Sequence, residues 1–410
     1  LASIARMAQG GMRDAQSILD QLISFCGRHI DEPDVLDVYG LASSAQLERI
    51  GRGLAVGDTA DLLAVTDELA GEGRDLVRVL NDVQVLVRES LLDSVRHGGR
   101  SGRLGTALTT EHYENFSVLS RLVPERLRPD FAAVYAYCRW ADDLGDETGC
   151  DDEAKQRSLE LLGWWRRELD ACFRYAADGD AADPPRHPVF VALVDSIQRR
   201  GLPKRPFEDL ITAFEQDQHI TRYRTWGQLI DYCANSANPV GRLVLAIGGY
   251  DMSNPAHSDL FRMSDATCTA LQLTNFWQDV RRDLFERDRI YLPAEETGIA
   301  ADELDQWARD PRGARPEDRV RYIKAIRHLC DRTERLFEEG RELPKALDNE
   351  LSPVVWLFGA GGEAVLGSVL RIGCTTLWRR PRLTKMDQLR LLLAASIRFR
   401  SQRARRCPAT

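Results

Sequence analysis

Motifs that mark several common classes of protein are missing from this chain of 410 residues. It has no GxxxxGK[ST] phosphate-binding loop and no GxGxxG dinucleotide fingerprint after a strand. No apolar run reaches the roughly 18 residues of a membrane span, and no signal peptide is recognised. The nine cysteines are scattered without CxxC pairs or metal-ligand spacing, which indicates reduced thiols in a cytoplasmic protein. The net charge of −8 argues against a general nucleic-acid binder, so no nucleic-acid partner is expected.

Strand patterns and repeats of fixed period are also missing, and the spacing that remains is helical. The hydrophobic fraction of 43% and the charged fraction of 29% are ordinary for a soluble protein with a large core. The segment HGGRSGRLG (97–105) is rich in glycine and arginine, as linkers are. The pattern therefore predicts an all-α protein with a small helical segment over 1–95, a linker over 96–107, one large domain over 108–400 and a basic tail over 401–410.

A polar stripe runs along the long helix expected within LQLTNFWQDVRRDLFERDRIYLP (271–293). Gln272, Asn275, Asp279 and Asp283 recur there at steps of 3, 4 and 4. This spacing predicts that they share one helical face among apolar neighbours. Taken alone, such a stripe is compatible with an ordinary solvated surface.

A second polar stripe lies far upstream, in FAAVYAYCRWADDLGDE (131–147). Tyr135, Arg139, Asp142 and Asp146 step by 4, 3 and 4, and Asp143 lies beside them. Carboxylates this close together repel one another on a helix unless a cation lies among them.

Two carboxylate pairs on facing helices suit a hard divalent cation. Mg²⁺ takes oxygen ligands and usually shares one or two carboxylates with substrate phosphates. Asp142 with Asp146, and Asp279 with Asp283, could therefore hold a diphosphate through bridging Mg²⁺. Arg139 would add a charge-assisted hydrogen bond to the same phosphate oxygens.

A proline interrupts a third helical segment, LIDYCANSANPVG (229–241). Pro239 leaves backbone groups near Ser236 without their helical partners. The interruption is either purely structural or lines a cavity between the two carboxylate helices.

The N-terminal segment resembles part of a known family. Its motif is GGMRDAQSILDQ (10–21). From this motif to about residue 95, the segment resembles the part that follows the ATPase core in the tau/gamma subunit of the bacterial DNA polymerase III clamp loader. In that family the arginine matching Arg13 senses bound nucleotide, but here the phosphate-binding loop is missing. We interpret the segment as a remnant or a gene-fusion product. The alternative is a docking module for other clamp-loader subunits.

Residues 108 to about 400 resemble the squalene/phytoene synthase family, on CRWADDLGDE and on LQLTNFWQDVRRD followed by RIYLP. HYENF, FEQDQHITRYRTW and YCANSANPVGRLVL point to the hopanoid-cluster subgroup called HpnC. The resemblance implies a large single-domain isoprenoid-synthase helical bundle and Mg²⁺ as cofactor. It also implies a prenyl or presqualene diphosphate substrate and a functional link to other hopanoid-cluster squalene enzymes.

The same resemblance assigns roles to individual residues. The metal-binding residues are Asp142, Asp143, Asp146, Asp279 and Asp283. The catalytic residues are Tyr135, Arg139 and Tyr232, with Tyr232 near the cyclopropylcarbinyl intermediate. The substrate-binding residues are Tyr113, Asn115, Phe116, Asn238, Gln272, Asn275, Arg289 and Tyr291.

Two departures from the family pattern bear on the reaction. Gln278 stands just before Asp279, where many relatives carry arginine. Asn238 and Pro239 stand where relatives usually have a small glycine-containing segment. Both changes could tune which carbocation is stabilised and whether water captures it.

Three hypotheses about function remain open. The first is Mg²⁺-dependent conversion of presqualene diphosphate to hydroxysqualene in bacterial squalene and hopanoid synthesis. The second is head-to-head condensation of two farnesyl or geranylgeranyl diphosphates to presqualene diphosphate, squalene or phytoene. The third is a clamp-loader interaction module with an inert C-terminal domain. The basic tail and the apolar segment 354–358 also leave open a peripheral contact with a membrane, in addition to a cytoplasmic location.

Overall fold

The computed structural model describes residues 43, 46, 47, 49, 50 and 59–71 and then, from 123 onward, residues 123–146, 149, 151–179, 183–348, 350–383, 387, 391 and 394. The chain divides into two compact units, Leu1–Glu111 and His112–Thr410. In the first unit, helix α5 (Thr59–Gly71) buries Val65 and Leu69. Arg49 forms ion pairs with Asp61 and Glu68 of this helix. The predicted linker (96–107) and basic tail (401–410) lie outside the described residues, as does most of the predicted segment 1–95.

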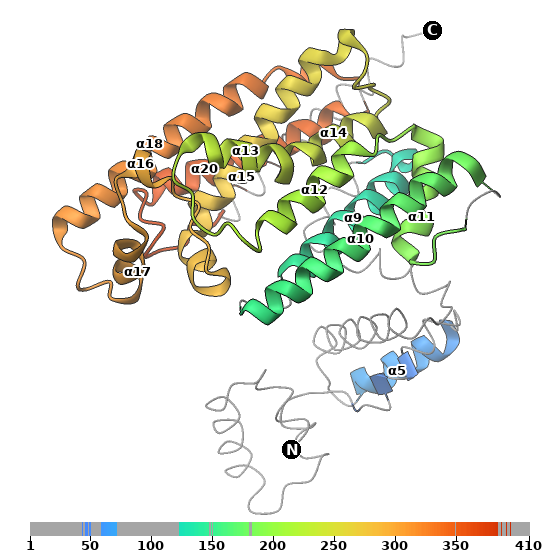
Figure 1. Cartoon of the computed structure of the whole chain (residues 1–410), viewed down its shortest axis with the longest axis horizontal. Coiled ribbons are helices and arrows are strands. Elements are labelled where there is room, and N and C mark those ends of the chain that lie inside the picture. The colour runs from blue at the N-terminus through green and yellow to red at the C-terminus, as the bar shows by residue number, and fades with distance from the viewer. Residues whose placement is uncertain are drawn as a thin grey trace, which may run out of the picture. The chain divides into compact units, whose positions relative to one another are not determined.

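The described part of the second unit is built from helices, as Figure 1 shows. The longer ones are α9 (Arg128–Asp146), α10 (Asp152–Asp178), α11 (Pro188–Arg200), α12 (Arg205–Gln216), α13 (Trp226–Ser236), α14 (Asn238–Ile247), α15 (Ser258–Arg287), α17 (Ala301–Arg309), α18 (Pro316–Gly340) and α20 (Ser352–Arg371). The short ones are η1 (Glu125–Leu127), η3 (Pro255–His257), α16 (Ala294–Thr297) and α19 (Leu343–Ala346). Strand pairing among these residues is limited to one isolated bridge between Arg222 and Ile290. The all-α prediction is confirmed.

Local sequence explains where several helices begin and end. The Asp151 side chain accepts from the backbone N–H of Ala154 and caps α10, which satisfies a donor that has no partner within the helix. α13 ends at Ser236, and α14 begins at Asn238 with Pro239 in its first turn, where a missing N–H costs nothing. The expected interruption at Pro239 is therefore a boundary between two helices.

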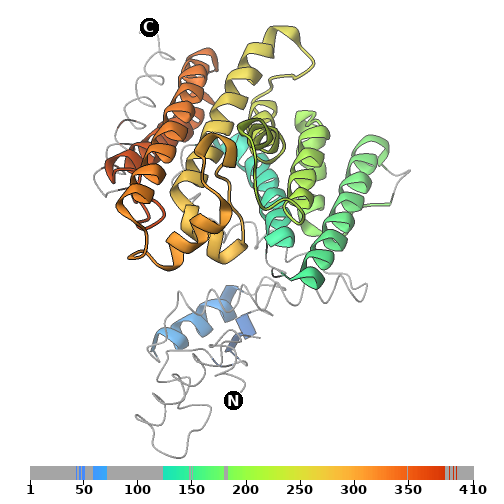
Figure 2. The same cartoon turned by 60° about the vertical axis from the view of Figure 1, so that its left-hand side comes forward.

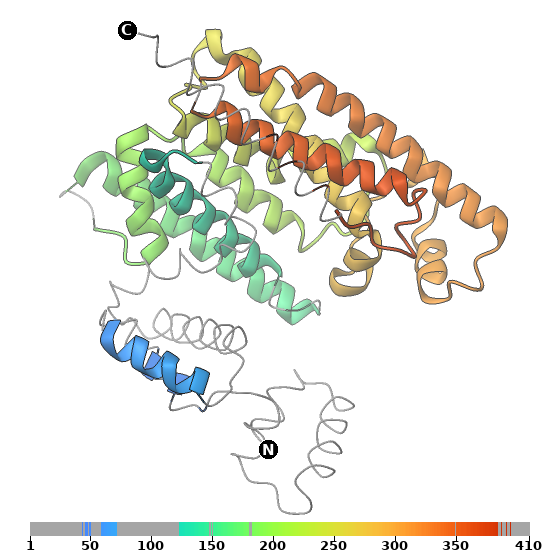
Figure 3. The same cartoon turned by 180° about the vertical axis from the view of Figure 1, so that it is seen from behind.

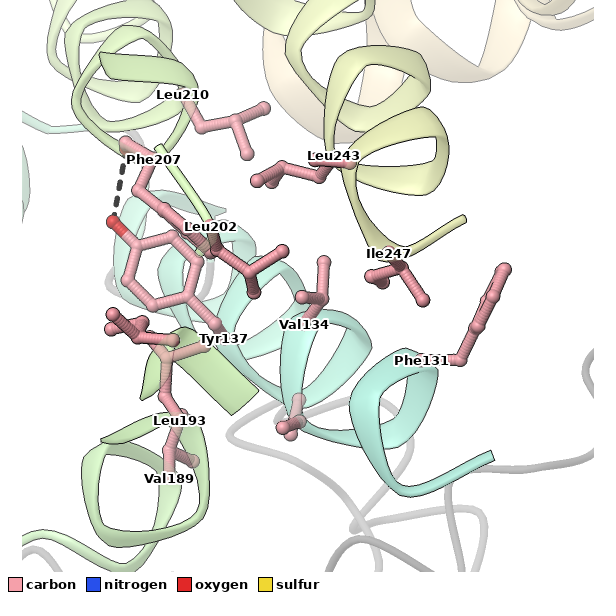
Figure 4. Close-up of a cluster of buried hydrophobic side chains, with 14 of the residues drawn as sticks. Phe131, Val134, Tyr137, Val189, Leu193, Leu202, Phe207, Leu210, Leu243 and Ile247 are labelled. Carbon is pink, nitrogen blue, oxygen red and sulfur yellow. Dashed lines mark hydrogen bonds between the residues drawn. The ribbon is translucent and has the colours of Figure 1, made fainter. Parts of the chain in front are cut away.

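Two hydrophobic cores hold the helices of this unit together. The first joins α9, α10, α11, α12 and α14, and Figure 4 shows part of it. Tyr137 of α9 is fully buried there, and its hydroxyl donates to the backbone carbonyl of Phe207 at 3.0 Å. Because a buried phenol needs such a partner, this bond fixes how α9 and α12 pack.

The second core lies around α15. It gathers side chains from α13, α15, α17, α18 and α20, and the indole of Trp277 donates to the Thr333 hydroxyl at 2.8 Å. α15 packs against α14 on the side of the first core and against α18 and α20 on the side of the second. Figure 2 shows α9 to α12 (teal to green) beside α15 and α18 (yellow and orange), and Figure 3 shows α18 and α20 side by side.

One helix in the described part of the chain, α20, is long and apolar enough to span a membrane by length and composition. It packs against α15, α18 and α19, and Val354 and Val369 are fully buried. Of its most apolar 18-residue window 39% is buried, so packing in the second unit accounts for part of its apolar composition.

Candidate active site

The C-terminal end of α9 carries three of the predicted metal-binding carboxylates. Arg139 forms ion pairs with Asp142 at 3.2 Å and with Asp143 at 2.8 Å, three and four residues further along the helix. The Tyr135 side chain lies next to this group, and its partial burial raises its pKa. The arginine thus compensates part of the negative charge that the sequence concentrates here.

Two arginines connect α9 with the end of α15. Arg287 lies 3.1 Å and Arg289 3.0 Å from the carboxylate of Asp146. Asp283, one turn before Arg287, is buried and interacts electrostatically with both arginines. The acidic ends of the two helices therefore face one another across a pair of guanidinium groups.

A third carboxylate completes this cluster from α12. Asp217 follows the helix directly, accepts a hydrogen bond from the Tyr232 hydroxyl at 2.9 Å, and lies 3.5 Å from Arg289. Both Asp217 and Arg289 are buried. The Oδ1 atom of Asp217 is buried without a hydrogen-bond partner among the described residues. A buried acceptor of this kind is ready for a ligand or a water.

Negative charge in the cluster is under-compensated. Burial, followed by the nearby Asp146 carboxylate, raises the pKa of Asp142 despite Arg139. Burial raises the pKa of Asp283 to about 7 and that of Asp217 to about 7, although Arg287 and Arg289 respectively counteract it. Carboxylates in this condition favour an additional cation.

The donor set fits a hard divalent cation that shares its coordination with a ligand. No three His, Cys, Asp or Glu side chains in the described part of the chain converge closely enough to hold a metal by themselves. Mg²⁺ characteristically takes one or two carboxylates and completes its octahedron with phosphate oxygens and water. The carboxylates of α9 and α15 therefore suit a metal that arrives with an anionic substrate.

Aromatic rings stand beside the charged cluster. Phe276 of α15 stacks on Tyr291 with ring centroids 3.7 Å apart, and Tyr232 lies 5.9 Å from Tyr291. Tyr223 extends the group, 5.6 Å from Tyr232. Four buried aromatic rings thus pack together next to the buried carboxylates.

An apolar cavity of about 220 Å³ lies between α13, α14, α15 and α20. Ser236 and Gln272 line the cavity, together with apolar side chains such as Leu271 and Phe358. Gln272 precedes Asp283 by 11 residues in α15. Because a helix rises about 1.5 Å per residue, this part of the cavity lies roughly 16 Å along α15 from the buried carboxylate.

The side chains of the polar stripe on α15 lie in different surroundings, because the helix is kinked at Asp279 (φ −109°, ψ 18°). Arg380, which follows α20, makes two hydrogen bonds to the Asp279 carboxylate at 2.6 and 2.9 Å. Gln278 donates to the carbonyl of Pro381 at 3.1 Å and so holds the same C-terminal segment. Asn275 is exposed.

The structure brings most of the predicted residues into one region. Arg289 and Tyr291 lie with Tyr232 and the α9 carboxylates, whereas Gln272 lines the apolar cavity further along α15. Asn238 is buried at the start of α14, and its side-chain oxygen accepts from the Thr269 hydroxyl at 2.9 Å. Tyr113, Asn115 and Phe116 lie outside the described residues.

Sequence reasoning missed Asp217, Arg287 and Arg380. Asp217 lies within FEQDQHITRY, a motif singled out for its resemblance without a role for its aspartate. Arg287 lies one turn beyond Asp283, so extending the stripe by four residues would have found it. No periodic signal marks Arg380, because it reaches Asp279 from 101 residues away.

Comparison with known proteins agrees with this geometry. Residues 109–387 match the family model described as squalene/phytoene synthase, so the chain belongs to that family. Its members are isoprenoid-synthase enzymes and depend in general on a divalent metal. The match to the ATPase lid domain of the DNA polymerase III clamp loader subunit is confined to residues 1–28.

Individual relatives make the position within the family more specific. A hydroxysqualene synthase from Rhodopseudomonas palustris is 32% identical over 240 residues, 57% of this chain and 71% of the relative. A 15-cis-phytoene synthase from Synechocystis is 30% identical over 256 residues, 61% of this chain and 70% of the relative. The crystal structure of the squalene synthase HpnC from Alicyclobacillus acidocaldarius has a TM-score of 0.54 and 41% identity, and the match covers 66% of this chain and 93% of that one. The predicted isoprenoid-synthase fold is confirmed.

Proposed function

We propose that this enzyme converts presqualene diphosphate and water into hydroxysqualene and diphosphate. The observation that carries the proposal is the arrangement of Asp217. Its buried carboxylate bonds Tyr232, keeps one oxygen without a partner, and lies between the charged cluster and a group of aromatic rings. The relatives named hydroxysqualene synthase support the same reaction.

The first step would break the carbon–oxygen bond of the substrate, with the electron pair leaving on the diphosphate. Asp142 and Asp146 of α9 and Asp279 and Asp283 of α15 would hold Mg²⁺, whose charge stabilises the developing diphosphate anion. Arg139 would turn its guanidinium to the same phosphate oxygens, as charge-assisted hydrogen bonds favour.

The carbocation left behind would rearrange from the cyclopropylcarbinyl form to an open-chain allylic cation. The rings of Tyr232, Phe276 and Tyr291 would face it, and the apolar cavity would exclude bulk water. One water held at the open oxygen of Asp217 would add to the cation and form the carbon–oxygen bond of the alcohol. Asp217 would accept the proton that this water loses, because burial raises its pKa to about 7 and makes it an effective base.

The contact between Asn238 and Thr269 favours this position for the water. The side-chain oxygen of Asn238 is already occupied by the Thr269 hydroxyl. Tyr232, by contrast, donates to Oδ2 of Asp217 and leaves the buried Oδ1 without a hydrogen-bond partner among the described residues. A water beside Tyr232 is therefore better supplied with hydrogen-bonding groups than one beside Asn238.

A product assay tests the proposed function. Purified protein with Mg²⁺ and without NADPH is given presqualene diphosphate or farnesyl diphosphate in separate reactions. We expect hydroxysqualene from presqualene diphosphate, and loss of that product in Asp142→Asn and Asp283→Asn. Asp305→Asn is the matched control, because Asp305 pairs with Arg309 four residues along α17 at a partly exposed position away from the cluster. Release of squalene or phytoene from prenyl diphosphates with no alcohol formed would overturn the proposal.

Condensation of two prenyl diphosphates is the second candidate, because phytoene synthases are among the relatives at 30–32% identity. It uses the same carboxylates and differs in the number of prenyl chains that must be bound at once. Turnover of farnesyl diphosphate in the assay above would establish it. A role beside other squalene enzymes, and a peripheral contact with a membrane, fit either reaction because both substrate and product are long hydrocarbons.

A further inference from the structure

A second cavity, of about 280 Å³, lies beyond the apolar one, among α15, α18, α19 and α20. Phe337, Trp356 and Ala360 supply its apolar lining, and Arg341 and Glu363 form an ion pair at its edge at 3.2 Å. Two residues, Thr267 of α15 and Val355 of α20, line both cavities. They therefore form the wall between them.

The side chain of Thr267 packs closely against α18 and α20 at this wall. A Cβ added to Gly340 of α18 would lie 2.0 Å from the Thr267 hydroxyl oxygen, and one added to Gly359 of α20 would lie 4.0 Å from its methyl carbon. The hydroxyl donates to the backbone carbonyl of Met263 at 3.0 Å, so it needs no partner in either cavity. Gly340 thus leaves room for this side chain, and Gly359 lies where a methyl group would just contact it.

We propose that Thr267, with Val355 beside it, closes the far end of the prenyl-chain cavity and sets the longest chain the enzyme accepts. The inference rests on the proposed function in one respect, because it takes a prenyl chain as the occupant of the apolar cavity. On this proposal a farnesyl-derived chain would end before the wall, whereas one with a further isoprene unit would meet Thr267. Removing the hydroxyl and methyl groups of Thr267 joins the two cavities and gives that unit the space among Phe337, Trp356 and Ala360.

The test compares binding of two stable substrate analogues, farnesyl and geranylgeranyl thiolodiphosphate, to the full-length protein with Mg²⁺ by calorimetry. In Thr267→Ala we expect the ratio of the two dissociation constants to move on the order of tenfold toward the longer chain, as discrimination in an apolar pocket does. Thr274→Ala is the matched control, because Thr274 lies on the same helix, is buried, and donates to the carbonyl of Ala270 in the same way without lining either cavity.

Two further variants make the test decisive. In Thr267→Ala/Gly359→Ala the added methyl group lies 4.0 Å from the position of the removed methyl carbon and narrows the opening from α20, so we expect the preference to move back toward the shorter chain. Val355→Ala trims the same wall from α20 and should act in the same direction as Thr267→Ala, which provides a test if the threonine variant does not fold. An unchanged ratio in a folded wall variant, an equal change in Thr274→Ala, or failure of both analogues to bind the unaltered protein would overturn the inference.

The binding ratio is independent of the product formed. If the ratio moves as expected but presqualene diphosphate gives no hydroxysqualene, the proposed reaction is wrong and the chain-length wall stands.

Discussion

Asp217 and Arg289 form the most deeply buried ion pair of the cluster. Arg289 is buried and lies beside two carboxylates, Asp146 at 3.0 Å and Asp217 at 3.5 Å. Removing one partner from such a group leaves an uncompensated buried charge. The two residues therefore act as a unit whose net charge is set by what binds next to it.

Replacing Asp217 with asparagine is expected to lower the rate of hydroxysqualene formation on the order of a hundredfold, the usual contribution of a positioned base. Asparagine keeps an acceptor for the Tyr232 hydroxyl but cannot take the proton from the attacking water. The measurement is kcat with presqualene diphosphate, together with the share of alcohol among all hydrocarbon products. Asp209→Asn controls for the loss of a charge, because Asp209 is a buried carboxylate of α12 that pairs with Arg205. Equal rates in the two variants would remove Asp217 from the mechanism.

His187 shows the effect of burial on a single titratable group away from the active site. Its ring packs edge-on against Trp140, Trp164 and Trp165, and its Nε2 has no hydrogen-bond partner among the described residues. Its Nδ1 accepts from the backbone N–H of Val189 at 3.4 Å and caps α11. Burial lowers the pKa of His187 to about 4.

This shift predicts how stability changes with pH. The folded protein keeps His187 neutral while the unfolded chain takes up a proton near pH 6.5, so the stability is fully present above that pH and is lost as the pH falls toward 4. The loss amounts to about 3 kcal/mol at most. Urea unfolding between pH 7 and 4 measures it. His187→Asn keeps a capping side chain and should flatten the dependence in this range; an unchanged slope would assign the effect to other groups.

At the scale of elements, the glycine where α14 crosses α15 determines how closely these two helices pack beside the apolar cavity. A Cβ added to Gly241 would lie 2.4 Å from the Ser264 hydroxyl oxygen and 2.5 Å from the Cys268 sulfur. The glycine thus lets the two helices approach at the point where Gly241, Ser264 and Cys268 line the apolar cavity.

Gly241→Ala is expected to destabilise the protein by about 1–3 kcal/mol, because the added methyl overpacks this crossing. Gly367→Ala should have the opposite sign, a gain of up to about 1 kcal/mol, because nothing lies within 4 Å of the new atom in the middle of α20. Chemical denaturation of both variants measures the difference. Trimming Cys268 and Ser264 to alanine in the Gly241→Ala background should recover part of the loss. Equal stability of the two glycine variants would show that α14 can move away without cost.

The elements also show what could be read from the sequence. Helical spacing and the positions of Pro239 and the acidic motifs predicted the helical fold, the break between α13 and α14, and the two carboxylate helices. The environments of the stripe on α15 could not be predicted, because the kink at Asp279 turns that residue toward Arg380. Asp217 was missed because its partners come from other helices, and helical periodicity carries no information about contacts between elements.

At the scale of the whole molecule, the family match over 109–387 places the chemistry outside the N-terminal unit. We expect a chain that begins at residue 108 to form the same product with unchanged kcat and KM, because every described residue of the cluster lies beyond 123. The assay is product formation from presqualene diphosphate by the truncated and the full-length chain, with circular dichroism as the control for folding. Loss of activity in a folded truncation would give the N-terminal residues, or those just before 123, a part in the reaction.

The kink in α15 has a consequence for how this protein can vary. The same helix carries Gln272, which lines the apolar cavity, and the buried carboxylate of Asp283. Asp279 lies at the kink between them. The number of residues between the two halves fixes how the side chains of one half are rotated about the helix axis relative to those of the other. A single inserted residue would rotate everything after it by about 100°. The length of this segment is therefore constrained as strictly as its composition, and a deletion that spares every polar side chain would still change how the buried carboxylate is oriented relative to the apolar cavity.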